Sequence, residues 1–259
     1  MATQKRSDDT VSLDTIEINR EELTFCLVGD SPLICNAMSE KVRQQLLVPP
    51  PRKNAAEKAM TLKHNPVGEF RGSMYRSRDP GSPTEIVMPF STIKSSLASV
   101  ALDMPGVAKT QLKRLIRVVD MEIPIWGIPK LFMAVTRNSD MGRTPDIRTR
   151  AILPKWATKV TLWYPVPLVR RDLVAKLIVT AGWIQGLGDW RLEKGGSYGA
   201  YRVCDADDAE YLDLVENAGR HAQVEAIENA GCYDKETEGL MAWYEAEVRR
   251  QGKAGLKVA

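Results

Sequence analysis

One glycine-rich stretch combines residue types that can bind a phosphate or a nucleic-acid base. Residues 186–201, GLGDWRLEKGGSYGAY, hold five glycines together with charged and aromatic side chains. Glycine can adopt positive φ angles and lets backbone amides approach an anion closely. Trp190 and Tyr198 offer faces for base stacking, and Arg191 and Lys194 can neutralise phosphates. The glycines of this expected anion-binding loop are Gly186, Gly188, Gly195, Gly196 and Gly199.

The elements around this loop exclude two common nucleotide-binding motifs. A dinucleotide fingerprint places its glycines between a strand and the helix that the glycines open. Here an apolar run with helical spacing, residues 173–184, precedes the glycines, and a strand-like segment, residues 200–204, follows them. A Walker loop is excluded because no Gly-Lys-Ser/Thr sequence ends the stretch. We therefore expect no nucleotide cofactor.

Further basic residues lie in two polar segments. Residues 136–150 are almost without apolar side chains, and their arginines outnumber Asp140 and Asp146. Residues 52–78 are also basic and poorly periodic. These segments form a candidate nucleic-acid surface, although a solvated loop with internal ion pairs is the alternative for 136–150. The basic residues expected to contact nucleic acid are Lys41, Arg43, Arg71, Arg76, Arg137, Arg143, Arg148 and Arg150.

The expected elements that position these residues follow the order β-α-β-β-α-β. We predict an α+β, ferredoxin-like (RRM-like) antiparallel sheet with helical insertions, both main helices on one face, and the other face free to bind. The predicted strands are 23–28, 85–88, 118–125, 131–135, 158–164 and 200–204. The predicted helices are 40–47, 92–102, 109–117 and 170–184.

Charge divides the chain into a basic body and an acidic appendage. We predict a disordered or extended lead over 1–20, a nucleic-acid-binding domain over 21–205, and a helical appendage over 206–259. Insertions are expected at about 48–84 and 136–156. Residues 205–250 hold thirteen acidic and four basic residues, although the whole chain carries a net charge of +3. The basic body indicates a polyanionic ligand.

No catalytic constellation stands out in the sequence. The only histidines are His64 and His221, and neither lies beside a nucleophile or a second base in the sequence. The four cysteines are scattered without a C-x-x-C pair, which predicts reduced thiols and no metal site. Asp140 and Asp146 lie among arginines and are interpreted as ion-pair partners. These patterns favour a binding protein over an enzyme.

Two stretches carry a resemblance to a known family. The helix followed by Gly186-Leu-Gly188, polar residues, Gly195-Gly196 and Gly199 resembles the glycine-rich loop of the RAMP superfamily. That superfamily supplies RNA-binding backbone subunits and processing ribonucleases of CRISPR systems. Residues 30–43, DSPLICNAMSEKVR, are similar to its first strand-to-helix junction. The likeness is to backbone-type members and their phage or prophage relatives, and it covers the layout of residues 20–205.

This resemblance implies a thumb-like insertion and a function. Arg137, Arg143, Arg148 and Arg150 would belong to the thumb, with Met141 or Ile147 as an apolar wedge. We expect a non-catalytic protein that binds single-stranded DNA or RNA and forms a homo-oligomer or filament along it. It would act in the cytoplasm of a bacterium, without membrane or cofactor, and could be phage-encoded. Two alternatives stay open: an endoribonuclease that depends on His64 or Asp146, and an inhibitor whose acidic appendage mimics nucleic acid.

Overall fold

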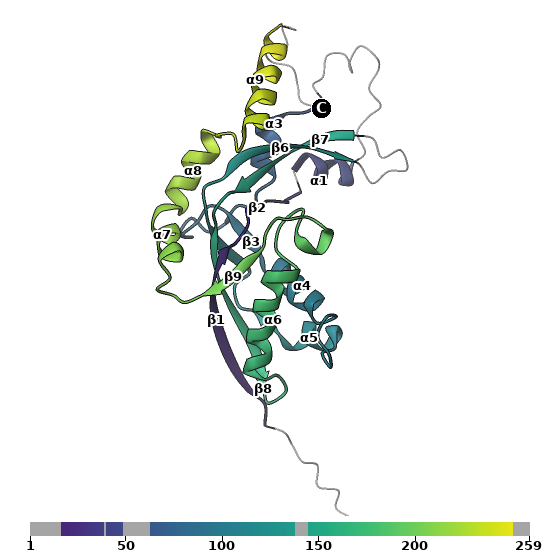
Figure 1. Cartoon of the computed structure of the whole chain (residues 1–259), viewed down its shortest axis with the longest axis vertical. Coiled ribbons are helices and arrows are strands. Elements are labelled where there is room, and N and C mark those ends of the chain that lie inside the picture. Colours follow the sequence, from purple (N-terminus) through teal and green to yellow (C-terminus); the bar gives the residue numbers. More distant parts are fainter. Residues whose placement is uncertain (1–16, 39, 49–62, 138–144, 251–259) are drawn as a thin grey trace, which may run out of the picture.

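The chain forms an elongated α+β structure built on two antiparallel sheets (Figure 1). The computed structural model describes residues 17–38, 40–48, 63–137 and 145–250. The expected lead therefore lies mostly outside the described residues, as do residues 49–62 of the first expected insertion and 138–144 of the second. None of the helices within the described ranges is both long and apolar enough to cross a membrane.

The larger sheet has the ferredoxin-like order that the sequence predicts. Its path runs β3-β5-β8-β1-β9, with β4 paired to the outer part of β8. In the β-α-β-β-α-β motif, β1 is the first strand, β8 the third and β9 the fourth. Strand β1 lies between β8 and β9, and these neighbours are antiparallel, as are β5 and β8. The strands are β1 (Asn19–Gly29), β3 (Val87–Pro89), β4 (Arg117–Val118), β5 (Glu122–Trp126), β8 (Ala157–Val166) and β9 (Tyr201–Cys204).

Two helices cover one face of this sheet, as expected. These are α4 (Phe90–Val100) and α6 (Arg171–Ile184), which pack against each other, with α5 (Lys109–Leu115) beside α4. Helix α6 presents Val174, Leu177 and Ile178 to the core, where all three are fully buried. This helical spacing of apolar residues is what fixes the face that the helix turns to the sheet.

A second sheet of three strands lies above the first (Figure 1). It contains β2 (Leu33–Ile34), β6 (Lys130–Arg137) and β7 (Pro145–Leu153), in the order β2-β7-β6. Strand β7 shows that the second part of the expected insertion over residues 136–156 is a regular strand and not the solvated loop that was its alternative. Its residues Thr149, Ala151 and Leu153 alternate along one buried face, but the intervening arginines hide this pattern in the sequence. Two short helices flank the sheet: α1 (Glu40–Leu47) and α3 (Pro66–Gly72).

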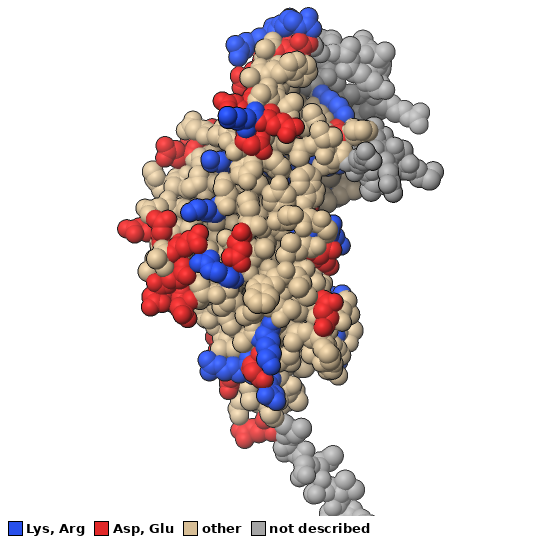
Figure 2. Space-filling view, viewed as in Figure 1, with Lys and Arg blue, Asp and Glu red and all other residues tan. Residues whose placement is uncertain are grey.

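The C-terminal part covers one half of the sheet face that the sequence predicted to be free. Helices α7 (Ala209–Asn217), α8 (Arg220–Glu228) and α9 (Lys235–Arg250) lie there and along β6. Tyr211 and Leu214 of α7 pack on Cys26 and Val28 of β1. The face is therefore only half open. Figure 2 shows the acidic side chains of this part gathered over α7.

A buried glutamine joins this C-terminal part to the body. Gln223 of α8 is fully buried, and its side-chain oxygen accepts hydrogen bonds from the backbone amides of Glu85 and Ile86. Its amide nitrogen donates to three carbonyl groups, of Ile125, Gly127 and Ala218. Because α8 completes backbone hydrogen bonding in the body, residues 206–250 pack as an integral layer of the molecule.

One predicted strand is divided in the structure. The sequence predicts a single strand over residues 118–125, whereas β4 ends at Val118 and β5 begins at Glu122. The two pieces pair with different parts of β8, Arg117 with Trp163 and Trp126 with Ala157. The intervening residues form the turn between these two pairings.

Candidate nucleic-acid interface

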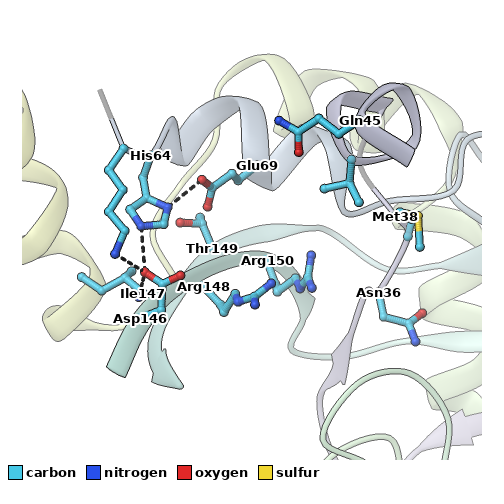
Figure 3. Close-up of a pocket in the computed structure, with 13 residues that line it drawn as sticks. Asn36, Met38, Gln45, His64, Glu69, Asp146, Ile147, Arg148, Thr149 and Arg150 are labelled. Atoms are coloured by element: carbon cyan, nitrogen blue, oxygen red, sulfur yellow. Dashed lines mark hydrogen bonds and ion pairs between the residues drawn. The ribbon is translucent and has the colours of Figure 1, made fainter. Parts of the chain in front are cut away.

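A pocket of about 470 Å³ opens beside β7. We call it the β7 pocket. Figure 3 shows its side chains, which come from four parts of the chain: the exit of β2, helix α1, the start of α3, and β7. Asn36, Met38 and Gln45 lie on one side, with His64 and Glu69 opposite, and residues 146–150 form its base. The pocket therefore unites segments that are far apart in the sequence.

Two of the predicted arginines line this pocket. Arg148 and Arg150 stand two residues apart on β7, so both project from the same face of the strand. Arg150 is about three-quarters buried, and its Nε lies 3.8 Å from the Asp189 Oδ2. Asp189 is held in turn by a hydrogen bond from its amide to the Ile34 carbonyl. Arg150 thus links the two segments that the sequence singled out separately, the arginine-rich segment and the glycine loop.

Two buried polar atoms on the pocket's base have no hydrogen-bond partner among the described residues. One is the Oγ1 of Thr149, a side chain that is only 2% exposed, and the other is the Nε of Arg150. The ion-pair distance from Arg150 to Asp189 is too long for a hydrogen bond. Buried polar atoms normally have partners. Both atoms are themselves almost inaccessible, and Thr149 points to the opposite face of β7 from Arg148 and Arg150, so these atoms alone do not mark a ligand contact.

A histidine held between two carboxylates forms the opposite wall (Figure 3). His64 Nδ1 lies 2.9 Å from Glu69 Oε1, and His64 Nε2 lies 3.0 Å from Asp146 Oδ1. Lys63 donates to the same Asp146 oxygen at 2.7 Å. That hydrogen bond, assisted by the one from His64, lowers the pKa of Asp146 against the opposing effect of burial. Tyr244 of α9 donates to the His64 carbonyl and fixes this segment.

The sequence did not reveal this cluster. His64 and Asp146 are separated by 82 positions, and only the packing of the α3 entry against β7 brings them together. The wall residues Asn36 and Gln45 were missed for the same reason, since isolated amides carry no local signal. One local signal was present: Asn65 caps α3 by accepting a hydrogen bond from the Gly68 amide, and this cap places His64 just before the helix.

The glycine loop corrects the expectation of a backbone phosphate cradle. Most of its amides donate to protein carbonyls, including Leu187 to Gly199, Asp189 to Ile34, and Gly199 to Pro32. A Cβ on Gly199 would lie 1.8 Å from the Leu187 oxygen, at a φ of +74°. Similar close approaches or positive φ angles occur at Gly186, Gly188, Gly195 and Gly196. These glycines allow the loop to fold tightly around the short 3-10 turn Leu192–Lys194, called η1.

The loop aromatics pack on the second sheet rather than standing alone. Trp190 and Tyr198 contact Phe132 of β6, with ring centroids 6.1 and 6.3 Å away, and Phe132 is paired across the ladder with Arg150. Burial raises the pKa of Tyr198. Both aromatic side chains are half-buried and lie on the sheet face that carries Arg150. Tyr201 is buried in the core and donates to the Ile178 carbonyl.

Several predicted contact residues have structural partners elsewhere. Arg71 donates to the Ile227 and Glu228 carbonyls at the end of α8. Arg76 lies 3.8 Å from Glu85, and Arg191 pairs with Glu193. These three are therefore not brought to the pocket.

The remaining predicted residues are more dispersed. Arg43, on the exposed surface of α1, donates to the Met38 carbonyl beside the pocket. Lys41 lies in the same helix, Lys194 is exposed in η1, and Arg137 is the last residue of β6. Arg143 and the proposed wedge Met141 lie outside the described residues. The described residues contain no cluster of three or more His, Cys, Asp or Glu side chains that could hold a metal ion.

Comparison with known proteins gives distant structural similarity only. No family model matches the chain, and no curated protein matches it. Among solved structures, a chain of the "Type III-B Cmr-beta bound to cognate target RNA" aligns over 72% of this chain with 11% identity and a TM-score of 0.35. The alignment spans 59% of that chain's length. At this identity and TM-score, no statement about function rests on the similarity.

Proposed function

We propose that this protein binds single-stranded nucleic acid, with the β7 pocket as its main contact. One observation carries the proposal: Arg148 and Arg150 project from the same face of β7, and both line the pocket. Guanidinium groups bind phosphate oxygens through charge-assisted hydrogen bonds. A phosphate in the pocket would supply acceptors for both guanidinium groups.

The other groups of the pocket suit an unpaired nucleotide. The side-chain amides of Asn36 and Gln45 can both donate and accept hydrogen bonds. The edges of bases are fully accessible to such groups only when the strand is unpaired. The same arrangement fits RNA and DNA, and binding of several copies along one strand belongs to the proposal. The opposed charges of the body and of α7 favour such contacts between copies.

A charge reversal at Arg148 tests the proposal. Arg148 is exposed, so Arg148→Glu should leave the fold intact while it opposes a phosphate. We expect affinity for single strands of any sequence to fall by about tenfold or more, and the salt dependence to flatten by about one contact. Arg114→Glu, an exposed arginine of α5 remote from the pocket, is the matched control. Equal affinity in the two variants would remove the β7 pocket as the site.

A second candidate function, metal-independent RNA cleavage, is favoured by the contact between His64 and Asp146. The imidazole shares the pocket with two arginines that could bind a phosphate, and it could take the proton of a ribose 2′-hydroxyl. The 2′-oxygen would then attack the adjacent phosphorus, and the bond from phosphorus to the 5′-oxygen of the next nucleotide would break. However, both ring nitrogens of His64 already contact carboxylates, so neither is available to a substrate in this arrangement. We therefore rank binding first.

The two candidates differ in one measurement. Cleavage predicts that the protein converts a labelled RNA into shorter products without added metal, and that His64→Ala abolishes this conversion. Binding alone predicts intact RNA after prolonged incubation, with His64→Ala still able to bind. A DNA strand of the same sequence serves as the control, because it lacks the attacking 2′-hydroxyl.

A further inference from the structure

The half of the larger sheet that α7 leaves open carries an aromatic ring between two arginines. The guanidinium carbons of Arg20 on β1 and Arg117 on β4 each lie 5.3 Å from the centre of the Trp163 ring on β8. We call these three residues the sheet-face site. In the ladder, Trp163 is paired with Arg117 on one side and with Glu22 on the other.

The register places this site on the face opposite to α4 and α6. Trp163 has the same parity on β8 as Ala157, which packs under α7, whereas Leu162 and Tyr164 point into the core below the two main helices. Trp163 is half-buried, and both arginines are exposed. The site therefore stands on a central strand of the sheet, on a surface that the described part of the chain does not cover.

Charge at the site is favourable for an anionic ligand. Arg20 pairs with Glu22, but no carboxylate among the described residues lies within ion-pair distance of Arg117. Lys159 is exposed on the same face of β8, four residues before Trp163. The hydroxyls of Thr24 and Thr161, which are 3.0 Å apart, fill the row between Lys159 and Trp163.

A hollow of about 590 Å³ opens next to this row. Lys159 and Thr161 form part of its wall, and Trp126 lies at the end nearer α7. Carboxylates of Asp79, Asp120 and Glu122 also line it. Acidic side chains accept hydrogen bonds from the amino groups of bases. These three carboxylates outnumber Lys159, so the hollow suits the amino groups of a base, whereas a phosphate would lie along the row of Arg117 and Lys159.

We propose that the sheet-face site is a second contact for single-stranded nucleic acid, separate from the β7 pocket. Aromatic side chains on the central strands of an antiparallel sheet stack unpaired bases, and guanidinium planes extend such stacks. Here a base stacks on the Trp163 and arginine planes while Arg117 and Lys159 neutralise the adjoining phosphates. The inference shares its ligand class with the proposed function but rests on different residues of a different sheet.

Two variants and one matched control test this site. Trp163→Ala removes the stacking surface, and Arg117→Glu reverses an exposed charge without touching the core. Trp183→Ala is the control, because Trp183 is 70% exposed on α6, on the opposite side of the sheet. Affinity for a labelled single-stranded 30-mer is measured by fluorescence anisotropy. We expect roughly 5-fold to 140-fold weaker binding for Trp163→Ala, a loss for Arg117→Glu that high salt diminishes, and no change for Trp183→Ala.

The outcomes separate this site from the β7 pocket. If Trp163→Ala and Arg117→Glu bind as the control does while Arg148→Glu is impaired, the sheet-face site is overturned and the proposed function stands. If the wild type binds no single strand, both fail. Ultraviolet crosslinking adds a readout independent of affinity: a crosslinked peptide from β8 is expected, and crosslinks confined to β7 would contradict the site. Trp163→Phe, which keeps a stacking ring, should retain most of the affinity and guards against misfolding of the alanine variant.

Discussion

The Nε of Arg150 lies 3.8 Å from the Oδ2 of Asp189, and this contact joins strand β7 to the glycine loop. Arg150 also lines the β7 pocket, so the loop contributes to the site through a carboxylate rather than through its backbone amides. Asp189 holds the arginine in place, but it also offsets part of the positive charge that a phosphate would meet.

Removal of this carboxylate should therefore strengthen nucleic-acid binding. We expect Asp189→Asn to raise affinity by about two-fold to five-fold at low salt, with the gain lost at high salt because it is electrostatic. The measurement is an anisotropy titration at two salt concentrations. Asp172→Asn is the matched control, since Asp172, in the first turn of the remote helix α6, also pairs with an arginine, Arg170, which precedes that helix. Weaker binding by Asp189→Asn would show that it orients Arg150 more than it competes with the ligand.

The stability of the protein should depend on Asp146 at neutral pH and much less in acid. The hydrogen bond from Lys63 lowers the pKa of Asp146. A carboxyl whose pKa is lowered by folding stabilises the protein above its unfolded pKa of about 3.9 and loses that contribution as the pH falls through the folded pKa. Asp146→Asn should thus be less stable than the wild type at pH 7.

This difference should shrink as the pH falls below about 4. Urea denaturation of both proteins across a pH series measures it, with Asp103→Asn, an exposed carboxylate on another part of the surface, as the control. A difference that stays constant down to pH 2 would contradict the ion-pair account of Asp146.

The sequence was a better guide to the scaffold than to the site. The ferredoxin-like order could be predicted because β1, β8 and α6 carry clear apolar periodicity. Strand β7 could not, because its outward arginines conceal the buried residues Thr149 and Ala151. The contact between His64 and Asp146 depends on tertiary packing alone. The role of the glycines was misjudged, since composition does not tell whether a loop amide donates to a ligand or to the protein.

Gly199 should not tolerate a side chain. Its φ of +74° and the 1.8 Å approach of a built Cβ to the Leu187 oxygen predict that Gly199→Ala destabilises the protein by about 2 kcal/mol or more. Gly239→Ala is the control: Gly239 lies in α9 with open space around it, and alanine there should stabilise by about 0.5–1 kcal/mol. Thermal unfolding of the two variants gives the comparison. A stable Gly199→Ala protein would show that the loop can fold in another way.

The C-terminal layer should be essential for stability. Gln223→Leu removes the hydrogen bonds that Gln223 makes to two amides and two carbonyls of the body and to the Ala218 carbonyl, and we expect a loss of about 3 kcal/mol or more. Glu225→Gln, on the exposed side of α8, is the control and should change stability little. Unfolding by urea measures both. A neutral Gln223→Leu would support an appendage that is independent of the body.

The most direct test of nucleic-acid binding is an anisotropy titration of the wild-type protein with labelled 30-mers of single-stranded RNA, single-stranded DNA and duplex, at low and moderate salt. The arginines of the β7 pocket predict tighter binding to a single strand than to duplex, weakened by salt. If none of the three ligands binds at low salt, the assignment of Arg148 and Arg150 as phosphate contacts is wrong.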